Sequence, residues 1–208
     1  MSEGAREGPF VISLDIGTSR IKGALVGREL SPFEDPVVRS TPSDPDGLVE
    51  AVAEVLDILV SSCPRPPSAV AISCYWHGLL LVDRQSRPLG AITTWQDTRD
   101  GQGAQRLREI MDPAQYHAKT GCFIHPSYPM TRIFMSRFAA VSGDAGRMVG
   151  PAEWIIMEFF GECVTSASMA SGTGLTRIGG DEYDPEVLDA AGVGYAELPR
   201  LSESPLTG

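Results

Sequence analysis

Residues 15–22 place a carboxylate, two hydroxyls and a cation within one short segment, Asp15-Ile16-Gly17-Thr18-Ser19-Arg20-Ile21-Lys22. A turn of this composition can bind phosphate, because backbone amides from Gly17 onward can line one concavity and the hydroxyls of Thr18 and Ser19 add hydrogen bonds. Lys22 would neutralise charge, and Asp15 would hold Mg²⁺ through water, since Mg²⁺ keeps much of its hydration beside phosphates. The alternative is a polar hairpin turn whose aspartate only bonds its own backbone. The spacing alone leaves both interpretations open.

A second candidate site is the segment Cys74-Tyr75-Trp76-His77-Gly78, which follows an apolar run typical of a strand. Strand ends that open on a loop are where open α/β sheets place ligands. An aromatic ring beside an imidazole suits a polyhydroxylated molecule, because the ring of Trp76 can pack on C–H faces while His77 bonds hydroxyls. The same pair also fits a core tryptophan beside a structural histidine.

The segment Thr94-Trp95-Gln96-Asp97-Thr98-Arg99 is a third candidate, again at an expected strand end. Asp97 and Arg99 lie two residues apart, so they also suit a simple ion pair or a cap for the next helix. The sequence contains no GxxxxGK[ST] and no Gly-x-Ser-x-Gly motif, which excludes a Walker-type nucleotide site and a hydrolase nucleophile elbow.

The elements that position these residues predict a mixed α/β fold. Strands are expected at residues 10–16 and 22–27, joined as a hairpin by the small-residue turn, with a third strand at 36–40. Apolar residues at helical spacing predict a helix over about 43–61, and residues 69–74 are expected to form a short buried strand. A meander followed by a helix and a further strand is typical of a mixed sheet and not of a parallel doubly wound one.

The second half of the chain is expected to be mainly helical. Residues 78–83 and 91–95 predict one more hairpin. Four helices are then expected, at about residues 103–111, 129–140, 151–161 and 184–192.

Composition narrows the function classes. The 208 residues carry 17 Lys and Arg against 27 Asp and Glu, a formal charge of −10, which argues against a general nucleic-acid binder. No apolar run approaches the roughly 20 residues of a membrane span. The start has no hydrophobic signal core, so residues 1–9 are expected to be a flexible tail on a cytoplasmic protein. Four scattered cysteines without a CxxC pair predict free thiols and no structural zinc.

Taken together, these segments resemble the N-terminal domain of the FGGY family of carbohydrate kinases, from about Phe10 to the end of the chain. The motifs occur in family order. They are the Asp-x-Gly-Thr-Ser turn, His77-Gly78-Leu79-Leu80-Leu81-Val82-Asp83, Trp95-Gln96-Asp97-Thr98-Arg99, Thr120-Gly121-Cys122 with His125-Pro126-Ser127-Tyr128, and Val164-Thr165 with Ser168-Met169-Ala170-Ser171-Gly172-Thr173-Gly174-Leu175.

The resemblance implies an actin-like, ribonuclease-H-like α/β domain with a mixed sheet and flanking helices. In this family a sugar or polyol binds between two such domains, and the γ-phosphate of MgATP is transferred to one of its hydroxyls. By resemblance, Asp15 would help to position Mg²⁺. The residues that would bind the ATP phosphates are Gly17, Thr18, Ser19 and Lys22.

The resemblance also implies a sugar-binding set. Trp76 and His77 occupy positions where family members contact the sugar, and Ser127 or Tyr128 would shape the same pocket. Asp97 is also assigned to sugar binding by the resemblance, on a weaker motif match. The motifs are most similar to gluconokinase-type members and next to xylulokinase-type members, whereas glycerol kinases have a different charged pattern after the strand.

Two departures qualify this resemblance. Ser166 stands where family members commonly carry an aspartate. The family's catalytic base and its C-terminal, adenosine-binding domain are expected beyond Gly208. Residues 10–208 are therefore expected to be an incomplete N-terminal domain that is inactive or nearly so alone. Dimers are common in the family, so the resemblance suggests a homodimer for the full-length protein. The alternatives are a non-catalytic sugar-binding or regulatory half-kinase and a structural α/β domain with a decayed site. No nucleic-acid or membrane partner is expected.

Overall fold

A computed structural model describes residues 8–28, 32, 34–138, 145–179 and 182–206. Most of the tail expected at residues 1–9 therefore lies outside the described residues. The chain divides into two compact units, Met1–Tyr75 and Trp76–Gly208.

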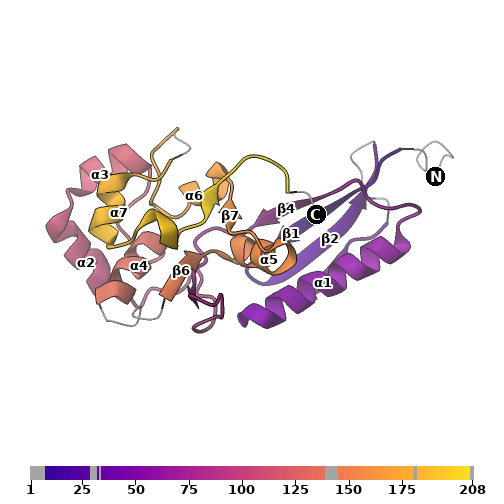
Figure 1. The fold of residues 1–208 in the computed structure, drawn as a ribbon, viewed down its shortest axis with the longest axis horizontal. Coiled ribbons are helices and arrows are strands. Elements are labelled where there is room, and N and C mark those ends of the chain that lie inside the picture. The colour runs from indigo at the N-terminus through magenta and orange to yellow at the C-terminus, as the bar shows by residue number, and fades with distance from the viewer. Residues whose placement is uncertain (1–7, 29–31, 33, 139–144, 180–181, 207–208) are drawn as a thin grey trace. The chain divides into compact units, whose positions relative to one another are not determined.

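The first unit is built on a four-stranded sheet with the order β3-β2-β1-β4. Strands β1, β2 and β3 form an antiparallel meander, and β4 joins β1 in parallel, so the sheet is mixed as predicted (Figure 1). The elements are β1 (Val11–Ile16), β2 (Arg20–Val26), β3 (Val37–Ser40), α1 (Pro45–Ser62) and β4 (Ala69–Cys74). The predicted hairpin, third strand and helix are confirmed.

Helix α1 begins where the sequence predicts and packs on β2 and β3. Asp44 caps it by accepting a hydrogen bond from the Gly47 amide at 2.8 Å, and Pro45 opens its first turn. Its apolar face is fully buried, and each such side chain contributes roughly 1.5–3 kcal/mol. Gly23 allows the close approach of helix and sheet, because a Cβ there would lie 2.4 Å from a methyl of Val55.

Strand β4 corrects one prediction. It forms as expected, but its side chains are exposed, including Val70 at 45% and Ile72 at 38%. The reason is its place in the sheet: β4 is an edge strand, and α1 covers β2 and β3 instead. Apolar runs of this length are typical of buried strands, and the sequence does not reveal which strand of a sheet lies at its edge.

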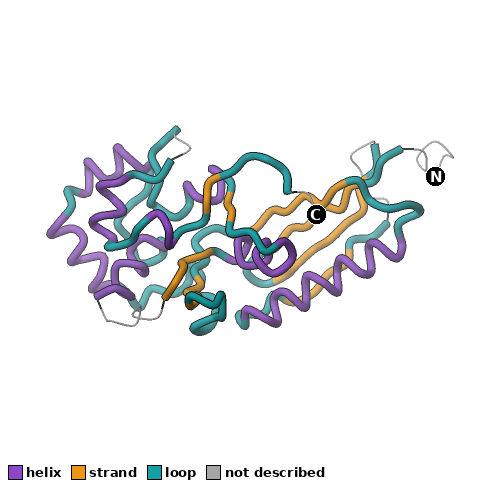
Figure 2. Tube along the Cα trace, viewed as in Figure 1, coloured by secondary structure: helices purple, strands orange, loops and turns teal. Residues whose placement is uncertain are grey.

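The second unit combines two small sheets with six helices among its described residues (Figure 2). Strand β5 (Leu80–Asp83) pairs antiparallel with β6 (Ala145–Val149), and β7 (Val164–Thr165) pairs parallel with β8 (Arg200–Leu201). The helices are α2 (Gly101–Ile110), α3 (Pro113–Thr120), α4 (Pro129–Phe138), α5 (Pro151–Phe160), α6 (Ala167–Ser171) and α7 (Pro185–Ala191), with a 3₁₀ turn η2 (Tyr195–Glu197).

The helices predicted near residues 103, 129, 151 and 184 are confirmed, and residues 139–140 lie outside the described part of the chain. The short helix α3 was not expected, although Asp112 caps it and Gly121, with φ 73°, ends it. Apolar residues of these helices surround one core that includes Leu107, Tyr116 and Met130. No helix in the described ranges is long and apolar enough to cross a membrane.

The hairpin expected from residues 78–83 and 91–95 forms only in part. Leu79 and Thr93 exchange backbone hydrogen bonds of 3.0 and 2.9 Å, but residues 91–95 do not continue as a regular strand. The regular partner of β5 is β6, which the sequence analysis missed. Pro88, which has no amide to donate, lies opposite Val82 and limits the ladder on that side.

Candidate functional site

The first candidate site is the turn between β1 and β2, in the first unit. The Gly17 amide donates to the Arg20 carbonyl at 2.9 Å and so closes the turn over Thr18 and Ser19. Thr41 holds the turn from the end of β3, since its hydroxyl donates to the Gly17 carbonyl at 2.8 Å. The turn is therefore held at its base by a backbone bond and by the Thr41 hydroxyl, while Ser19 at its tip is exposed.

Asp15 and Lys22 lie directly opposite each other on β1 and β2. The Lys22 Nζ is 3.5 Å from a carboxylate oxygen of Asp15, and both side chains are more than half exposed. Asp15 thus pairs with Lys22 across the hairpin. The alternative interpretation predicted instead that Asp15 bonds its own backbone, and no such bond is found among the described residues. An exposed ion pair of this kind adds little to stability. Because both side chains are exposed, their charges are accessible to a ligand.

The Gly17 amide, one of the expected phosphate donors, already bonds the Arg20 carbonyl and is not accessible to a ligand. The hydroxyls of Thr18 and Ser19 have no protein partner within the described residues. The prediction of a phosphate contact therefore depends on Thr18, Ser19 and Lys22, while Gly17 shapes the turn.

Asp15 is the residue expected to hold Mg²⁺. The described residues contain no group of three or more His, Cys, Asp or Glu side chains that could hold a metal by themselves. A single accessible carboxylate beside phosphate-binding groups nevertheless fits Mg²⁺, which uses one or two carboxylates together with substrate phosphates and water. The four cysteines are free thiols.

The second candidate site begins at His77, in the second unit. His77 adopts a left-handed backbone conformation, with φ 63°, which is uncommon for a residue with a side chain. Its Nδ1 lies 2.7 Å from the Gly172 carbonyl. Because a carbonyl only accepts, Nδ1 carries the proton, and in the neutral ring Nε2 has a free lone pair. Backbone strain held in this way is characteristic of functional positions.

Burial lowers the pKa of His77 below its ordinary value of 6.5. The hydrogen bond to Gly172 raises it in part, and the positive charge of Arg132 lowers it further. The neutral imidazole is therefore favoured at neutral pH, with Nε2 as a hydrogen-bond acceptor.

Two aromatic side chains flank this imidazole. Trp76 is 47% exposed and packs on the backbone of Gly172, where an added Cβ would lie 3.0 Å from Cγ of the indole. The ring of Tyr128 meets His77 edge to face, with centroids 4.5 Å apart. Trp76, His77 and Tyr128 thus form one cluster with Gly172, which we call the aromatic cluster.

Ser127 lies next to the aromatic cluster in the chain. It is half-buried, its amide donates to Nδ1 of His125 at 3.1 Å, and its carbonyl accepts from Arg132 at 2.9 Å. The structure therefore shows backbone contacts of Ser127, and a sugar contact of its hydroxyl stays a prediction.

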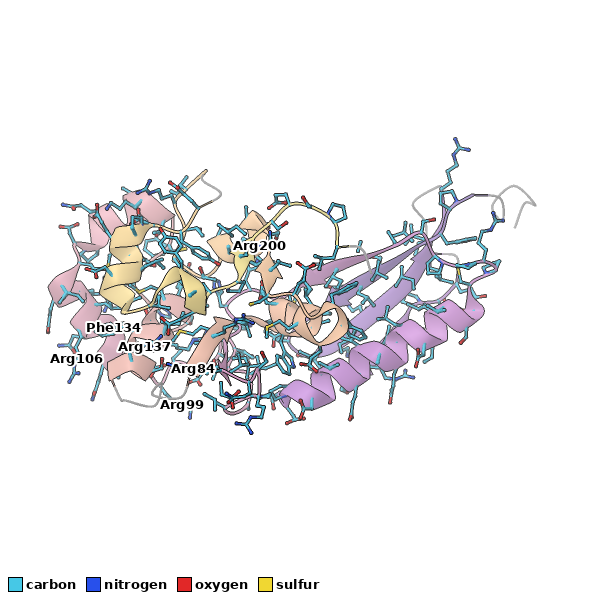
Figure 3. The ribbon with its side chains drawn as sticks, in the orientation of Figure 1. Arg84, Arg99, Arg106, Phe134, Arg137 and Arg200 are labelled. Carbon is cyan, nitrogen blue, oxygen red and sulfur yellow. The ribbon has the colours of Figure 1, made fainter. Side chains whose placement is uncertain are left out.

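Asp97 is engaged by Arg99, which is labelled in Figure 3. Arg99 Nε donates to its carboxylate at 2.9 Å, and this bond is the main reason that the pKa of Asp97 falls to about 2. The cap position of α2 belongs to Asp100. Of the interpretations considered for the Asp97–Arg99 spacing, the ion pair forms, and a sugar contact of Asp97 stays a prediction.

Asp97 also lines a cavity of about 450 Å³ in the second unit. Thr93, Asp100 and Arg132 contribute further polar groups to its wall, and leucines contribute much of the rest. The residues of the aromatic cluster do not line this cavity. The predicted sugar-binding residues therefore fall into two groups, with Arg132 in contact with the segments of both.

Two residues of the second site were missed by the sequence analysis. Gly172 lies in a motif that the resemblance quotes, but no role was given to it. Arg132 belongs to no motif. Helical spacing places residue 132 away from the face that Met130, Phe134 and Phe138 share, so the apolar pattern does not predict its burial.

Residues 10–206 match the sequence profile described as "FGGY family of carbohydrate kinases, N-terminal domain". The chain therefore belongs to this family, as its motifs indicated. Among solved structures, it resembles gluconate kinase from Lactobacillus acidophilus with a TM-score of 0.87 and 25% identity, over 93% of this chain and 42% of that one. The actin-like fold is thereby confirmed.

Two curated relatives illustrate the range of similar proteins. A gluconokinase of Bacillus subtilis (strain 168) is 26% identical over 92% of this chain. A xylulose kinase of Streptomyces coelicolor is 28% identical over 95% of it. The matches cover 40% and 43% of those proteins, so the chain spans about two fifths of their length.

Proposed function

We propose that this chain is the sugar-binding, N-terminal part of a carbohydrate kinase that transfers the γ-phosphate of MgATP to a hydroxyl of a sugar or sugar acid. The observation that carries the proposal is the strained, neutral His77 held between Gly172 and Tyr128 beside an exposed indole. Family membership supplies the reaction class. No residue of this chain is proposed as the general base.

The turn between β1 and β2 would bind the phosphates. Thr18 and Ser19 would donate hydroxyl hydrogen bonds, and Lys22 would place its charge beside the transferred group. Asp15 would hold Mg²⁺, which when bound neutralises charge on the phosphates. Because phosphoryl transfer depends mainly on positioning and charge stabilisation, these four side chains would act on the rate and not on sugar affinity.

The aromatic cluster would bind the sugar. The free lone pair of His77 Nε2 would accept a hydrogen bond from a sugar hydroxyl. The exposed face of Trp76 would pack on C–H groups of the same molecule. Tyr128 would fix the plane of the imidazole, and Ser127 and Asp97 would complete the polar wall.

We propose gluconate as the preferred acceptor and xylulose as the next. Support comes from the motifs quoted above and from similarity to proteins named gluconokinase and xylulose kinase. We further propose a cytoplasmic location, which the four free thiols support.

The test is a coupled assay of ADP release by the full-length protein with gluconate, xylulose and glycerol as acceptors. We expect turnover with gluconate at the lowest KM, and His77→Gln should raise that KM by about tenfold or more, the effect expected for one lost hydrogen bond in a buried site. His117→Gln is the matched control, because His117 bonds the Cys122 carbonyl at 3.2 Å and lies outside the aromatic cluster. ADP release that is independent of every sugar, or that His77→Gln leaves unchanged, would overturn the proposal.

A non-catalytic sugar-binding module is the second candidate. It is favoured by one observation: the phosphate-binding residues and the aromatic cluster lie in different compact units. This candidate predicts calorimetric binding of gluconate that is the same in wild type and in Asp15→Ala, with no ADP release by either protein.

A further inference from the structure

Arg132 is an arginine buried to 4% exposure on helix α4. Its guanidinium donates four hydrogen bonds. One terminal nitrogen bonds the Thr93 hydroxyl at 2.7 Å and the Thr94 carbonyl at 3.1 Å. The other bonds the Ser127 carbonyl at 2.9 Å and the His77 carbonyl.

These acceptors come from three segments that are far apart in the sequence. Each segment carries residues proposed to bind sugar: Trp76 and His77 in the first, Asp97 in the second, and Ser127 and Tyr128 in the third. A planar guanidinium offers its donors in a fixed fork, so two pairs of bonds on its two terminal nitrogens hold the segments at one relative spacing. Arg132 therefore joins the two groups of predicted sugar-binding residues.

The bond to the His77 carbonyl has a particular consequence. His77 occupies a left-handed conformation, which is strained for a residue with a side chain and persists only where its surroundings fix it. Its side chain is fixed by the Gly172 carbonyl and its backbone by Arg132. Without Arg132 the carbonyl would be free to turn, and Nε2 would no longer point in one direction.

We propose that Arg132 is a positioning residue for sugar recognition: it aligns the three segments so that His77, Tyr128 and the wall carrying Asp97 face one sugar, and it thereby sets which sugar is accepted. This inference rests on the proposed function, which assigns sugar binding to these three segments. The alignment itself follows from the four hydrogen bonds.

Arg132→Lys is the central variant. Lysine keeps the charge, but a single ammonium cannot reach acceptors on both sides of the guanidinium. In the full-length protein we expect the KM for gluconate to rise by about tenfold to a hundredfold and the KM for ATP to change by less than about twofold. The ratio of gluconate to xylulose kcat/KM should fall, because the two acceptors depend on the same spacing to different degrees.

Arg137→Lys is the matched control. Arg137, labelled in Figure 3, lies on the same helix and is partly buried. It pairs with Glu197 and, among the described residues, with none of the three segments. Its substitution should leave the sugar KM and the sugar preference unchanged. It should lower the thermal midpoint by less than Arg132→Lys does, because Arg137 pairs with one side chain and is less buried than Arg132. Equal effects of the two variants on the sugar KM would overturn the inference, because they would show a general loss of stability.

Thr93→Val keeps the test decisive if Arg132→Lys does not fold. It removes the hydroxyl that accepts from Arg132 and that also donates to the Leu79 carbonyl at 3.1 Å. It keeps the shape of the side chain and the two backbone bonds between Thr93 and Leu79, which hold these segments together without the hydroxyl. We expect a twofold to fivefold rise in the gluconate KM at an unchanged ATP KM. An unchanged gluconate KM in Thr93→Val would overturn the inference.

A measurement without substrate separates this inference from the proposed function. NMR signals of the His77 imidazole and of the Trp76 and Trp95 indoles should shift together in Arg132→Lys or Thr93→Val and stay in place in Arg137→Lys. If wild type releases no ADP with any sugar while these signals shift, the proposed function fails and the alignment by Arg132 stands. If wild type is active and the signals stay in place, the inference fails alone.

Discussion

The turn between β1 and β2, which we propose binds phosphate, and the aromatic cluster differ in what holds their side chains in place. The turn is eight consecutive residues held by the pairing of β1 with β2, and its charged side chains are exposed. The cluster and the segments that flank it are drawn from positions between 76 and 172, and a buried guanidinium and one glycine hold them together. One site is fixed locally and the other by tertiary contacts.

This difference predicts different effects of substitutions in the two regions. Substitutions in the turn should remove a charge or a hydroxyl and leave the fold intact, because the backbone ladder defines the turn. Substitutions around the cluster should move several side chains at once, because one residue supports contacts on more than one segment. Substitutions in the turn should therefore mainly lower kcat, and substitutions around the cluster should mainly raise the sugar KM.

The largest effect is expected from Asp15→Ala and Lys22→Ala in the full-length protein. Each variant should lower kcat by on the order of 100-fold or more, because each removes a charge that we propose acts on the transferred phosphoryl group. The sugar KM should stay within about threefold of wild type, and the thermal midpoint should hardly change, since the pair is exposed. Steady-state kinetics with the sugar and ATP varied in turn measure both constants.

Lys119→Ala is the matched control for Lys22→Ala. These are the two lysines of the chain, and Lys119 pairs with Glu186 in the second unit. Its substitution should leave kcat unchanged. A rise of the sugar KM in Lys22→Ala as large as the fall of kcat would show that the turn also binds sugar, and the contrast between the two regions would be lost.

A smaller effect is expected from Gly172→Ala. Gly172 has φ −70° and ψ −9°, so alanine can adopt this backbone without strain, and the added Cβ would meet the Trp76 indole at 3.0 Å. The indole must move by a few tenths of an ångström, and we expect kcat/KM for gluconate to fall by about tenfold. Unfolding monitored by circular dichroism should show a near-normal midpoint.

Gly101→Ala serves as the control, because a Cβ at Gly101, in the first turn of α2, meets nothing within 4 Å. It should leave kcat/KM unchanged. Wild-type kinetics in Gly172→Ala would show that the indole does not contact the sugar.

The same contrast explains what the sequence could predict. The hairpin that carries the turn was predictable, because its residues are adjacent and a hairpin is a local structure, although the bond of the Gly17 amide to the Arg20 carbonyl was not. Trp76 and His77 were predictable as a pair for the same reason. The predicted helices were found because Asp or Pro at their starts and Gly at their ends act locally, as at Asp184 and Gly192.

What depends on tertiary structure was not predictable. The exposure of β4 and the pairing of β5 with β6 both depend on which elements become neighbours. Arg132 shows the limit most clearly: its four acceptors lie between 5 and 55 residues away along the chain. Helical spacing places residue 132 away from the apolar face of its helix, so the sequence pattern reveals neither its burial nor what it bonds.

Acid pH should weaken sugar recognition through His77. Protonation of Nε2 removes the lone pair that accepts from the sugar, so kcat/KM for gluconate should fall as the pH drops below 6.5. The lowered pKa of His77 places this decline below that value. His77→Gln should flatten the acid limb of the pH profile, and His117→Gln should retain it. An acid limb that persists in His77→Gln would assign the titration to another group.

The stability of the fold should also decrease at acid pH. Because burial lowers the pKa of His77 in the folded state, the unfolded chain binds more protons just below pH 6.5. The free energy of unfolding should therefore decrease as the pH falls through this window. The dependence should be weaker in His77→Gln, as measured by urea unfolding at pH 7.5 and 5.5.

The smallest effect is expected from Thr41→Val, which tests whether the turn is really held locally. The variant removes the 2.8 Å bond to the Gly17 carbonyl and keeps the backbone bond from the Thr41 amide to the Ser19 carbonyl at 3.1 Å. One hydrogen bond contributes about 1 kcal/mol to stability, and the β1–β2 ladder stays in place. We therefore expect kcat to fall by at most about threefold, far less than in Lys22→Ala. A loss of 30-fold or more would mean that the turn, like the aromatic cluster, depends on a distant side chain for its geometry.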